Sequence, residues 1–233
     1  MKVNGTHYRS IWYDHELSKV KIIDQRWLPH DFKIIELETL QSFAVAIKDM
    51  WVRGAPLIGA TAAYGVAIAL ENDASDGGLK NAYETLIKTR PTAINLRWSL
   101  DRMQKDLANI PENQRPAIAM KIAHQIAEED VEINKNIGEF GLKIIKKLAE
   151  VKEPGEPVRL LTHCNAGWPA TVDWGTATSP MYHAHNENIP IHVWVDETRP
   201  RNQGGMTAWA VSYTHLRAHE TGRNLVCRLL LEK

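Results

Sequence analysis

Residues 158–178 read VRLLTHCNAGWPATVDWGTAT, and this stretch decides the fold that the sequence predicts. We interpret residues 158–162 as a short β-strand that is buried on both faces of a sheet. The strand would end at residues 163–167 (HCNAG), a turn of small and polar residues, with a helix beyond it. Ligands of open α/β sheets bind just beyond the carboxyl ends of the strands, so Cys164 is a candidate site residue. The alternative is that Cys164 is a small buried apolar side chain.

A second strand of the same kind follows. Residues 178–188 are expected to form a helix and residues 191–195 (IHVWV) a second buried strand. A strand–helix–strand order is a βαβ unit, which predicts a parallel sheet. Polar residues at 196–204 (DETRPRNQG) would then share the sheet edge of Cys164. No G-x-G-x-x-G motif follows the first strand, so a dinucleotide cofactor is not supported.

The beginning of the chain predicts a different kind of sheet. Short strands separated by turn residues, typical of a small antiparallel sheet, are expected at residues 8–13, 20–24 and 32–37. Thr39 would then cap a helix that runs to about Met50. Residues 72–79 (NDASDGGL) have the composition of a loop, and a helix is expected at about 79–88.

Two arginines precede expected helices and are candidates for binding an anion. Arg53 is followed by Gly54, Ala55 and Pro56, and proline favours the first turn of a helix, here expected to run to about Leu70. Free backbone N–H groups at a helix start, with an arginine beside them, attract phosphate.

Arg90 stands just before Pro91, which disfavours helical geometry at the preceding residue. Arg90 is therefore expected in a turn ahead of a helix at about 93–107, as a second candidate for binding phosphate. For Arg53 and Arg90 alike, the alternative is a structural or solvated salt bridge, and spacing alone leaves that choice open.

A long helical pattern spans about 115–150, and Gly138 and Gly141 are expected to break or kink it. Its acidic cluster at 128–132 is interpreted as a solvated helix face rather than a set of catalytic carboxylates. His183 and His185 stand two apart on an expected helix, so they diverge and make a poor metal pair. We therefore predict no metal site.

Composition limits the function classes. Lys+Arg and Asp+Glu are equal at 28 each in 233 residues, which gives no electrostatic case for a nucleic-acid or membrane-surface partner. No apolar run approaches the ~20 residues of a membrane span, and the N-terminus lacks the apolar core of a signal peptide. Cys164 and Cys227 stand far apart outside any CxxC pattern, so free thiols and a cytoplasmic location are expected.

Four motifs, in a fixed order, indicate a family. They are residues 53–56 (RGAP), 90–96 (RPTAINL), 162–167 (THCNAG), and 196–200 with 203–204 (DETRP and QG). From about Ile11 to Trp209 the chain resembles the methylthioribose-1-phosphate isomerases, which are related to the alpha, beta and delta subunits of translation initiation factor 2B. The resemblance implies an α/β fold, whose expected parts are a small N-terminal domain of sheet and helices (1–112), a connecting helical segment (113–150), and a truncated, partial Rossmann-like parallel-sheet domain (151–210).

The resemblance also implies a reaction. An aldose 1-phosphate, 5-methylthioribose 1-phosphate, would become the ketose 1-phosphate in methionine salvage, without metal or organic cofactor. The anomeric phosphate locks the sugar ring, so the ring must open before a proton moves from C2 to C1, and a tuned thiol can serve in that transfer. A homodimer is the implied assembly. The implied roles are phosphate binding by Arg53, Gly54, Ala55 and Arg90, sugar contact by Gln203, and catalysis by Cys164.

Two alternative functions remain open. A ribose-1,5-bisphosphate isomerase would need an extra anion site, and residues 168–173 contain no Lys or Arg. A non-catalytic scaffold, like the regulatory subunits of the initiation-factor exchange complex, would not need Cys164 together with Arg53 and Arg90.

The resemblance ends near residues 209–211. We expect residues 211–233 (VSYTHLRAHETGRNLVCRLLLEK) to be a non-native tail that does not continue the fold, and the chain to be an incomplete fragment. The resemblance implies an Asp beyond the next strand as the acidic partner of the cysteine, and Asp196 belongs to a different motif. We accordingly expect the chain as written to be poorly stable and inactive.

Overall fold

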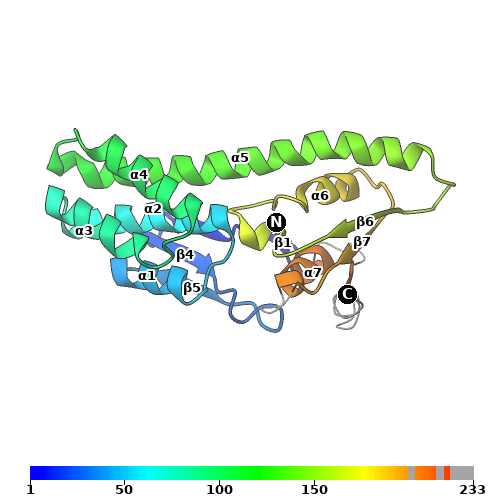
Figure 1. The fold of residues 1–233 in the computed structure, drawn as a ribbon, viewed down its shortest axis with the longest axis horizontal. Coiled ribbons are helices and arrows are strands. Elements are labelled where there is room, and N and C mark those ends of the chain that lie inside the picture. The colour runs from blue at the N-terminus through cyan, green and yellow to red at the C-terminus, as the bar shows by residue number, and fades with distance from the viewer. Residues whose placement is uncertain (199–202, 214–217, 221–233) are drawn as a thin grey trace, which may run out of the picture. The chain divides into compact units, whose positions relative to one another are not determined.

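The computed structural model describes residues 1–198, 203–213 and 218–220, and Figure 1 shows its ribbon. The chain divides into two compact units. The first, which we call the helical unit, contains Arg9–Glu132 and Ala170–Asp173. The second, which we call the sheet unit, contains Met1–Tyr8, Ile133–Pro169 and the described residues from Trp174 onward.

The helical unit contains the predicted antiparallel sheet, which is confirmed. Its strands, in the order β3-β4-β5, are Ile11–Asp14, Lys19–Ile23 and Ile34–Leu37. Alternate residues of these strands, such as Val20 and Ile22, are completely buried, and Val20 pairs with buried Leu37 across the ladder. This alternation gives the sheet one core face, as expected of an antiparallel sheet in a small domain.

Helix α2 is the centre of the helical unit. The helices of this unit are α1 (Leu40–Lys48), α2 (Ala55–Asn72), α3 (Asp76–Ile87) and α4 (Ile94–Leu107). Small residues let the neighbours approach α2: a β-carbon at Gly65 would lie 3.0 Å from Phe43 of α1, and one at Gly59 would lie 3.0 Å from the Asn95 carbonyl oxygen of α4. Ser99 of α4 also donates its hydroxyl to the Gly59 carbonyl at 2.7 Å.

Capping residues explain where two of these helices begin. The predicted cap at Thr39 is confirmed, because its hydroxyl accepts from the Ser42 N–H and Ser42 bonds back in a capping box. Helix α3 begins at Asp76, earlier than the predicted residue 79. The reason is Ser75, whose side chain accepts from the Gly78 N–H and starts the helix inside the stretch that composition had indicated as a loop.

The expected break in the long helix is wrong. A short 3₁₀ turn, η1 (Glu112–Gln114), leads into a single helix α5 (Arg115–Glu150) that runs through Gly138 and Gly141. Both glycines face α6 (Ser179–Asn186), where a β-carbon at Gly138 would lie 2.5 Å from His183 Cε1. A β-carbon at Gly141 would lie 2.8 Å from Pro180 Cβ. These glycines therefore admit a neighbouring helix rather than interrupt their own.

This packing predicts the sign of a substitution. Gly138→Ala is expected to lower the free energy of unfolding by about 1–3 kcal/mol, because the new methyl group collides with α6. Helix propensity alone would instead raise it by about 1 kcal/mol. Urea denaturation measures the difference, with exposed Lys147→Ala on the same helix as the control. A Gly138→Ala variant more stable than wild type would contradict the packing role.

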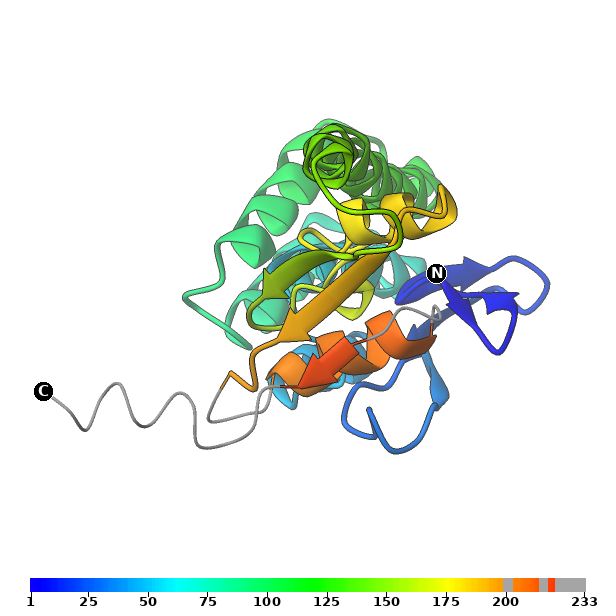
Figure 2. The same cartoon turned by 90° about the vertical axis from the view of Figure 1, so that its right-hand side faces the viewer.

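The predicted βαβ unit is confirmed in the sheet unit. The strands β6 (Val158–Thr162), β7 (Ile191–Val195) and β8 (Ala218–Glu220) form a parallel sheet in that order. Figures 1 and 2 show β6 and β7 side by side, with α6 as the crossover helix between them. The remaining elements of the described residues are β1 (Lys2–Val3), β2 (Thr6–His7), η2 (Trp168–Ala170) and α7 (Gln203–Tyr213).

The expectation that β6 and β7 are buried on both faces is wrong. Val158 and Thr162 are buried, but Arg159 is exposed and Leu161 is 66% exposed. Likewise Trp194 in β7 is 41% exposed. Val158 packs with Leu142, Ile145 and Ala184 in one cluster, so the described helices α5 and α6 cover a single face of this sheet. Buried and exposed side chains therefore alternate along these strands, although the sequences do not alternate strictly between apolar and polar residues.

The structure also differs from the expectation that the fold stops near residue 211. Helix α7 extends to Tyr213, and β8 pairs in parallel with β7, with Val193 opposite Ala218. Residues 214–217 and 221–233, which include Cys227, lie outside the described part of the chain. Whether residues 211–233 are native stays a prediction.

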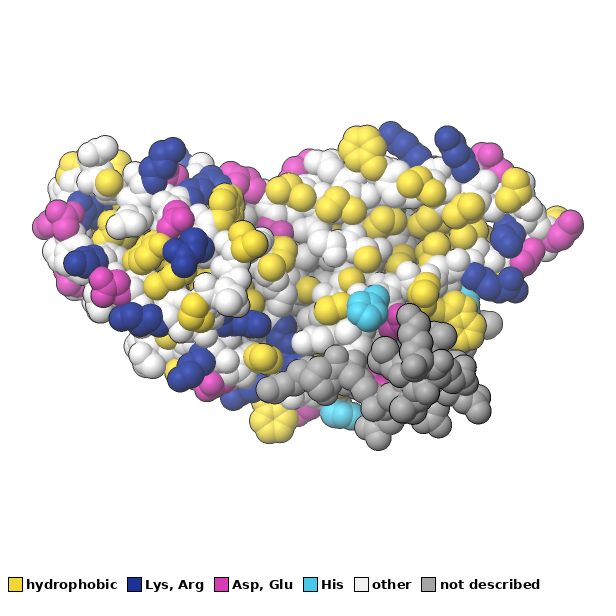
Figure 3. Space-filling view, viewed as in Figure 1, with side chains coloured by type: hydrophobic (Ala, Val, Ile, Leu, Met, Phe, Trp, Pro, Cys, Tyr) yellow, Lys and Arg dark blue, Asp and Glu magenta, His cyan; other side chains and the backbone are white. Residues whose placement is uncertain are grey.

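The C-terminal half of α5 carries a row of exposed apolar side chains, and Figure 3 shows hydrophobic groups gathered over it. They recur at helical intervals and comprise Ile133, Ile137, Phe140, Ile144 and Leu148. Within the described residues, no helix has both the length and the apolar composition needed to cross a membrane.

Candidate active site

The sequence Arg53-Gly54-Ala55 forms the entry to α2. Gly54 is the N-cap with φ of 95°, a left-handed conformation, and Pro56 occupies the first turn. A β-carbon at Gly54 would lie 2.5 Å from Ala170 Cα and would collide with the Ala170 carbonyl oxygen, so this position requires glycine. Ala55 is exposed and Arg53 is partly buried. The 18-residue helix has no acidic side chain in its first turn, so its positive end can receive an anion.

Arg90 lies in the turn that precedes α4, as predicted. The Ala93 N–H donates to the Arg90 carbonyl at 3.0 Å, and the Arg90 side chain is partly exposed. The close approach of Gly59 to Asn95 joins the first turns of α2 and α4. The helical unit therefore places both predicted phosphate-binding segments at the starts of two adjoining helices.

Cys164 stands at the carboxyl end of β6 in the sheet unit. It is an exposed free thiol whose φ is 66°, an uncommon left-handed value for a residue with a side chain. Two threonines hold its peptide groups. The Cys164 N–H donates to Thr198 Oγ1 at 2.8 Å, and Thr207 Oγ1 donates to the Cys164 carbonyl at 2.8 Å.

The next strand, β7, brings polar groups to the same edge. Asp196 follows it, and its Oδ2 lies 3.2 Å from His163 Nδ1. Thr198 Oγ1 also lies 3.5 Å from His163 Nδ1. The Gly204 N–H donates to the Glu197 carbonyl at 3.0 Å, which ties the start of α7 to this segment. The predicted gathering of residues 163–167 and 196–204 at one sheet edge is confirmed for the residues that the structure describes.

Several buried polar atoms at this edge have no hydrogen-bond partner among the described residues. They are Asn165 Oδ1 and Nδ2, Gln203 Oε1 and Thr162 Oγ1. Such atoms are uncommon in folded proteins, and at a site they are available to a ligand. Sequence reasoning had selected Gln203 but not Asn165, and the asparagine between Cys164 and Ala166 carries no pattern of its own that would single it out.

The acidic cluster of α5 has structural partners. Glu128 pairs with Arg9, and Glu129 pairs with Arg102 at 2.5 Å. These arginine bonds hold the pKa of both carboxyl groups below their ordinary values. Asp130 accepts from the Val172 N–H at 2.7 Å. Glu128 and Glu129 are exposed, as predicted. However, the carboxylates of Glu128, Glu129 and Asp130 bond to other segments of the helical unit.

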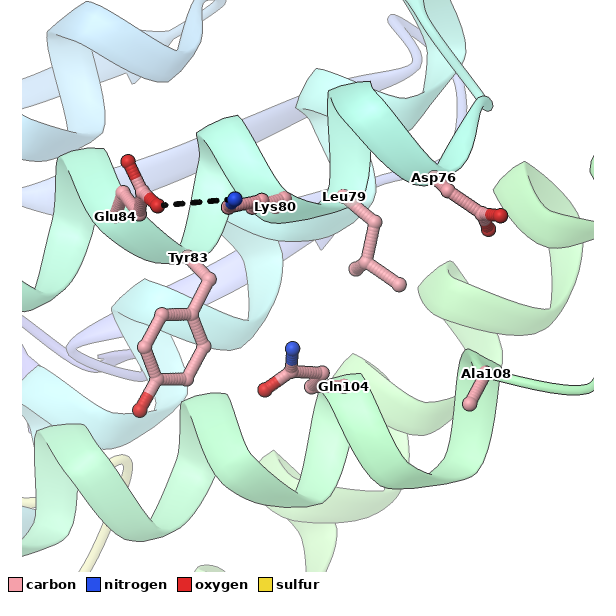
Figure 4. Close-up of a pocket in the computed structure, with 7 residues that line it drawn as sticks. All are labelled: Asp76, Leu79, Lys80, Tyr83, Glu84, Gln104 and Ala108. Atoms are coloured by element: carbon pink, nitrogen blue, oxygen red, sulfur yellow. Dashed lines mark ion pairs between the residues drawn. The ribbon is translucent and has the colours of Figure 1, made fainter.

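A surface pocket of about 550 Å³ lies in the helical unit between α3 and α4 (Figure 4). Its mixed lining comprises Asp76, Leu79, Lys80, Tyr83, Glu84, Gln104 and Ala108. Lys80 and Glu84 form an ion pair across one turn of α3 at 3.9 Å. None of the predicted site residues lines this pocket. In the described residues, no group of three or more His, Cys, Asp or Glu side chains is arranged to hold a metal ion.

Residues 51–217 match the sequence profile of the Initiation factor 2 subunit family, which covers more than half of the chain. The chain belongs to this family. Its resemblance to the isomerase branch is confirmed by relatives named methylthioribose-1-phosphate isomerase. The protein from Sinorhizobium medicae is 58% identical over 213 residues, covering 91% of this chain. The protein from Escherichia coli O45:K1 is 54% identical over 209 residues, covering 90% of this chain.

Two solved structures have the same fold, which confirms the α/β fold class. The 5-methylthioribose 1-phosphate isomerase of Pyrococcus horikoshii matches with a TM-score of 0.80 and 35% identity, covering 100% of this chain and 66% of that chain. The translation initiation factor eIF-2B subunit delta of A. fulgidus matches with a TM-score of 0.80 and 35% identity, covering 97% and 65%. The chain spans 58% of the length of the Sinorhizobium relative and 56% of the E. coli relative.

Proposed function

We propose that the protein is an aldose–ketose isomerase that converts 5-methylthioribose 1-phosphate to 5-methylthioribulose 1-phosphate, a step of methionine salvage. The observation that carries this proposal is the similarity itself. Relatives that are 52% to 59% identical over about nine-tenths of the chain share the name methylthioribose-1-phosphate isomerase. The geometry of each unit supplies groups that suit this chemistry.

The phosphate would bind at the start of α2. The N–H groups of Gly54 and Ala55 stand at the positive end of an 18-residue helix, and Arg53 directly precedes them in the chain. Arg90 would add a second positive charge. Helix N–H groups and arginines together bind phosphate through charge-assisted hydrogen bonds. Fixing the phosphate holds the sugar in one orientation, which is the main requirement for a proton transfer between neighbouring carbons.

The sugar would bind at the edge of the parallel sheet. The Cys164 thiol is exposed there, and the buried Gln203 Oε1 has no hydrogen-bond partner among the described residues. Gln203 would accept from a sugar hydroxyl. Cys164 would take part in moving the proton from C2 to C1 after ring opening, which converts the aldehyde to the ketone with no net gain or loss of electrons.

A regulatory scaffold is the second candidate. It is favoured by the equal TM-score and identity of the structure named translation initiation factor eIF-2B subunit delta. A scaffold has no need of a sugar-phosphate site. Binding of substrate therefore separates the two functions.

The test is a thermal-shift titration of the purified chain with 5-methylthioribose 1-phosphate, ribose 1,5-bisphosphate and inorganic phosphate. At 100 times the dissociation constant, a ligand that binds only the folded state stabilises it by about 2.7 kcal/mol. We expect the methylthio sugar to stabilise most. Greater stabilisation by the bisphosphate would favour the bisphosphate isomerase, and none by either sugar would overturn the proposal. Ketose formation in the same samples would support the proposed reaction directly, and it would overturn the separate expectation that the chain as written is inactive.

We further propose that the protein is cytoplasmic, acts without metal or organic cofactor, and forms a homodimer. Nucleic acid and membrane are not proposed as partners, because the net charge is zero. Sedimentation equilibrium would measure the mass of the assembly. Activity that requires an added metal ion would contradict the cofactor-free proposal.

A further inference from the structure

The turn that carries Cys164 is held by threonine hydroxyls. Besides the bonds to Cys164, Thr207 Oγ1 accepts from the Ala166 N–H at 3.1 Å. The Thr178 hydroxyl lies 3.0 Å from the Trp174 carbonyl and 3.4 Å from the Ala166 carbonyl, as a shared donor. Thr178 and Thr207 are completely buried. The peptide groups on both sides of Asn165 are therefore fixed by side chains that come from other segments of the sheet unit.

Asn165 contrasts with its neighbours. Its amide Oδ1 and Nδ2 are both buried, and neither has a hydrogen-bond partner among the described residues. A buried amide without partners destabilises a fold, because it loses its bonds to water and gains none in return. Threonine hydroxyls already hold the backbone of this turn, so the Asn165 amide is not needed to fix it. A bound ligand would explain why the amide is kept there.

We propose that the Asn165 amide is a substrate-binding group that contacts the hydroxyl-bearing part of the sugar 1-phosphate beside Cys164. This inference rests on the proposed function. An amide offers an acceptor and two donors, which matches a sugar hydroxyl and the carbonyl formed on ring opening. Its position just beyond the carboxyl end of β6 is where ligands of parallel sheets bind. Its sequence neighbour Cys164 has the exposed thiol.

The test compares Asn165→Leu with Thr207→Val in the full chain. Asn165→Leu is expected to weaken binding of 5-methylthioribose 1-phosphate roughly tenfold or more, about 1.4 kcal/mol for each factor of ten, and to leave inorganic phosphate binding unchanged. Its unfolding midpoint should equal or exceed that of wild type, because no bond within the described residues is lost. Thr207→Val should lower the midpoint, since it removes the bonds to Cys164 and Ala166.

Two results would overturn the inference. One is an Asn165→Leu variant that binds the sugar phosphate as tightly as wild type. The other is an Asn165→Leu midpoint that falls as far as that of Thr207→Val, which would make the amide a structural group. If wild type itself binds no sugar phosphate, the proposed function fails and this inference fails with it. If wild type binds and Asn165→Leu binds equally, only this inference fails.

Discussion

Gly54→Ala is expected to destabilise the helical unit by about 3 kcal/mol or more, and to abolish phosphate binding at the start of α2. The left-handed φ of 95° strains any residue with a side chain, and the new methyl group would collide with the Ala170 backbone. Backbone atoms cannot rotate away as a flexible side chain can. Urea denaturation and the thermal-shift titration measure the two effects.

Gly155→Ala separates strain from collision. Gly155 has a similar φ of 85°, but a β-carbon there would meet no atom within 4 Å. Its substitution is therefore expected to show only the conformational term, about 1–2 kcal/mol. Equal losses for Gly54→Ala and Gly155→Ala would show that the approach of Ala170 to Gly54 is not tight in solution.

Arg53→Met is expected to weaken binding of 5-methylthioribose 1-phosphate by roughly 30- to 1,000-fold, which corresponds to about 2–4 kcal/mol. Methionine keeps most of the length and apolar stem of arginine but removes the charge that would pair with phosphate. Isothermal titration calorimetry measures the loss, and inorganic phosphate should lose affinity in parallel because both ligands would use the same contact. The effect should shrink as the salt concentration rises.

Arg97→Met is the matched control for this experiment. Arg97 is an exposed arginine on α4, in the same helical unit, and belongs to none of the predicted contacts. Its loss changes the net charge by the same amount. If Arg97→Met weakened binding as much as Arg53→Met, long-range charge rather than a contact at the start of α2 would explain the affinity.

Local signals predicted many of the elements well. The cap at Thr39, the proline in the first turn of α2 and the turn at Arg90 each act within a few residues, so they can be read directly from the chain. The same holds for the βαβ order of β6, α6 and β7. Ser75 shows the limit of this approach, because one serine in a loop-like stretch was enough to begin α3 early.

The other errors came from features that depend on distant residues. Gly138 was expected to break α5, but its lack of a side chain serves the approach of α6. Leu161 was expected to be buried, but α5 and α6 pack on the opposite face of β6 and Leu161 is exposed. The sequence alone does not distinguish a glycine that breaks a helix from one that admits a neighbouring helix, or a buried leucine from an exposed one. The contact that decides comes from another segment of the chain.

The sequence by itself determined most of the helix starts, the two kinds of sheet and the family motifs, because caps, periodicity and motif spacing are local properties of the chain. Tertiary structure decided how the turn at Cys164 is held, through hydroxyls of Thr178, Thr198 and Thr207 that stand far from it in sequence. It also decided that the Asn165 amide is buried without a described partner. Burial and hydrogen-bond satisfaction depend on which segments meet in space, and no local pattern records them.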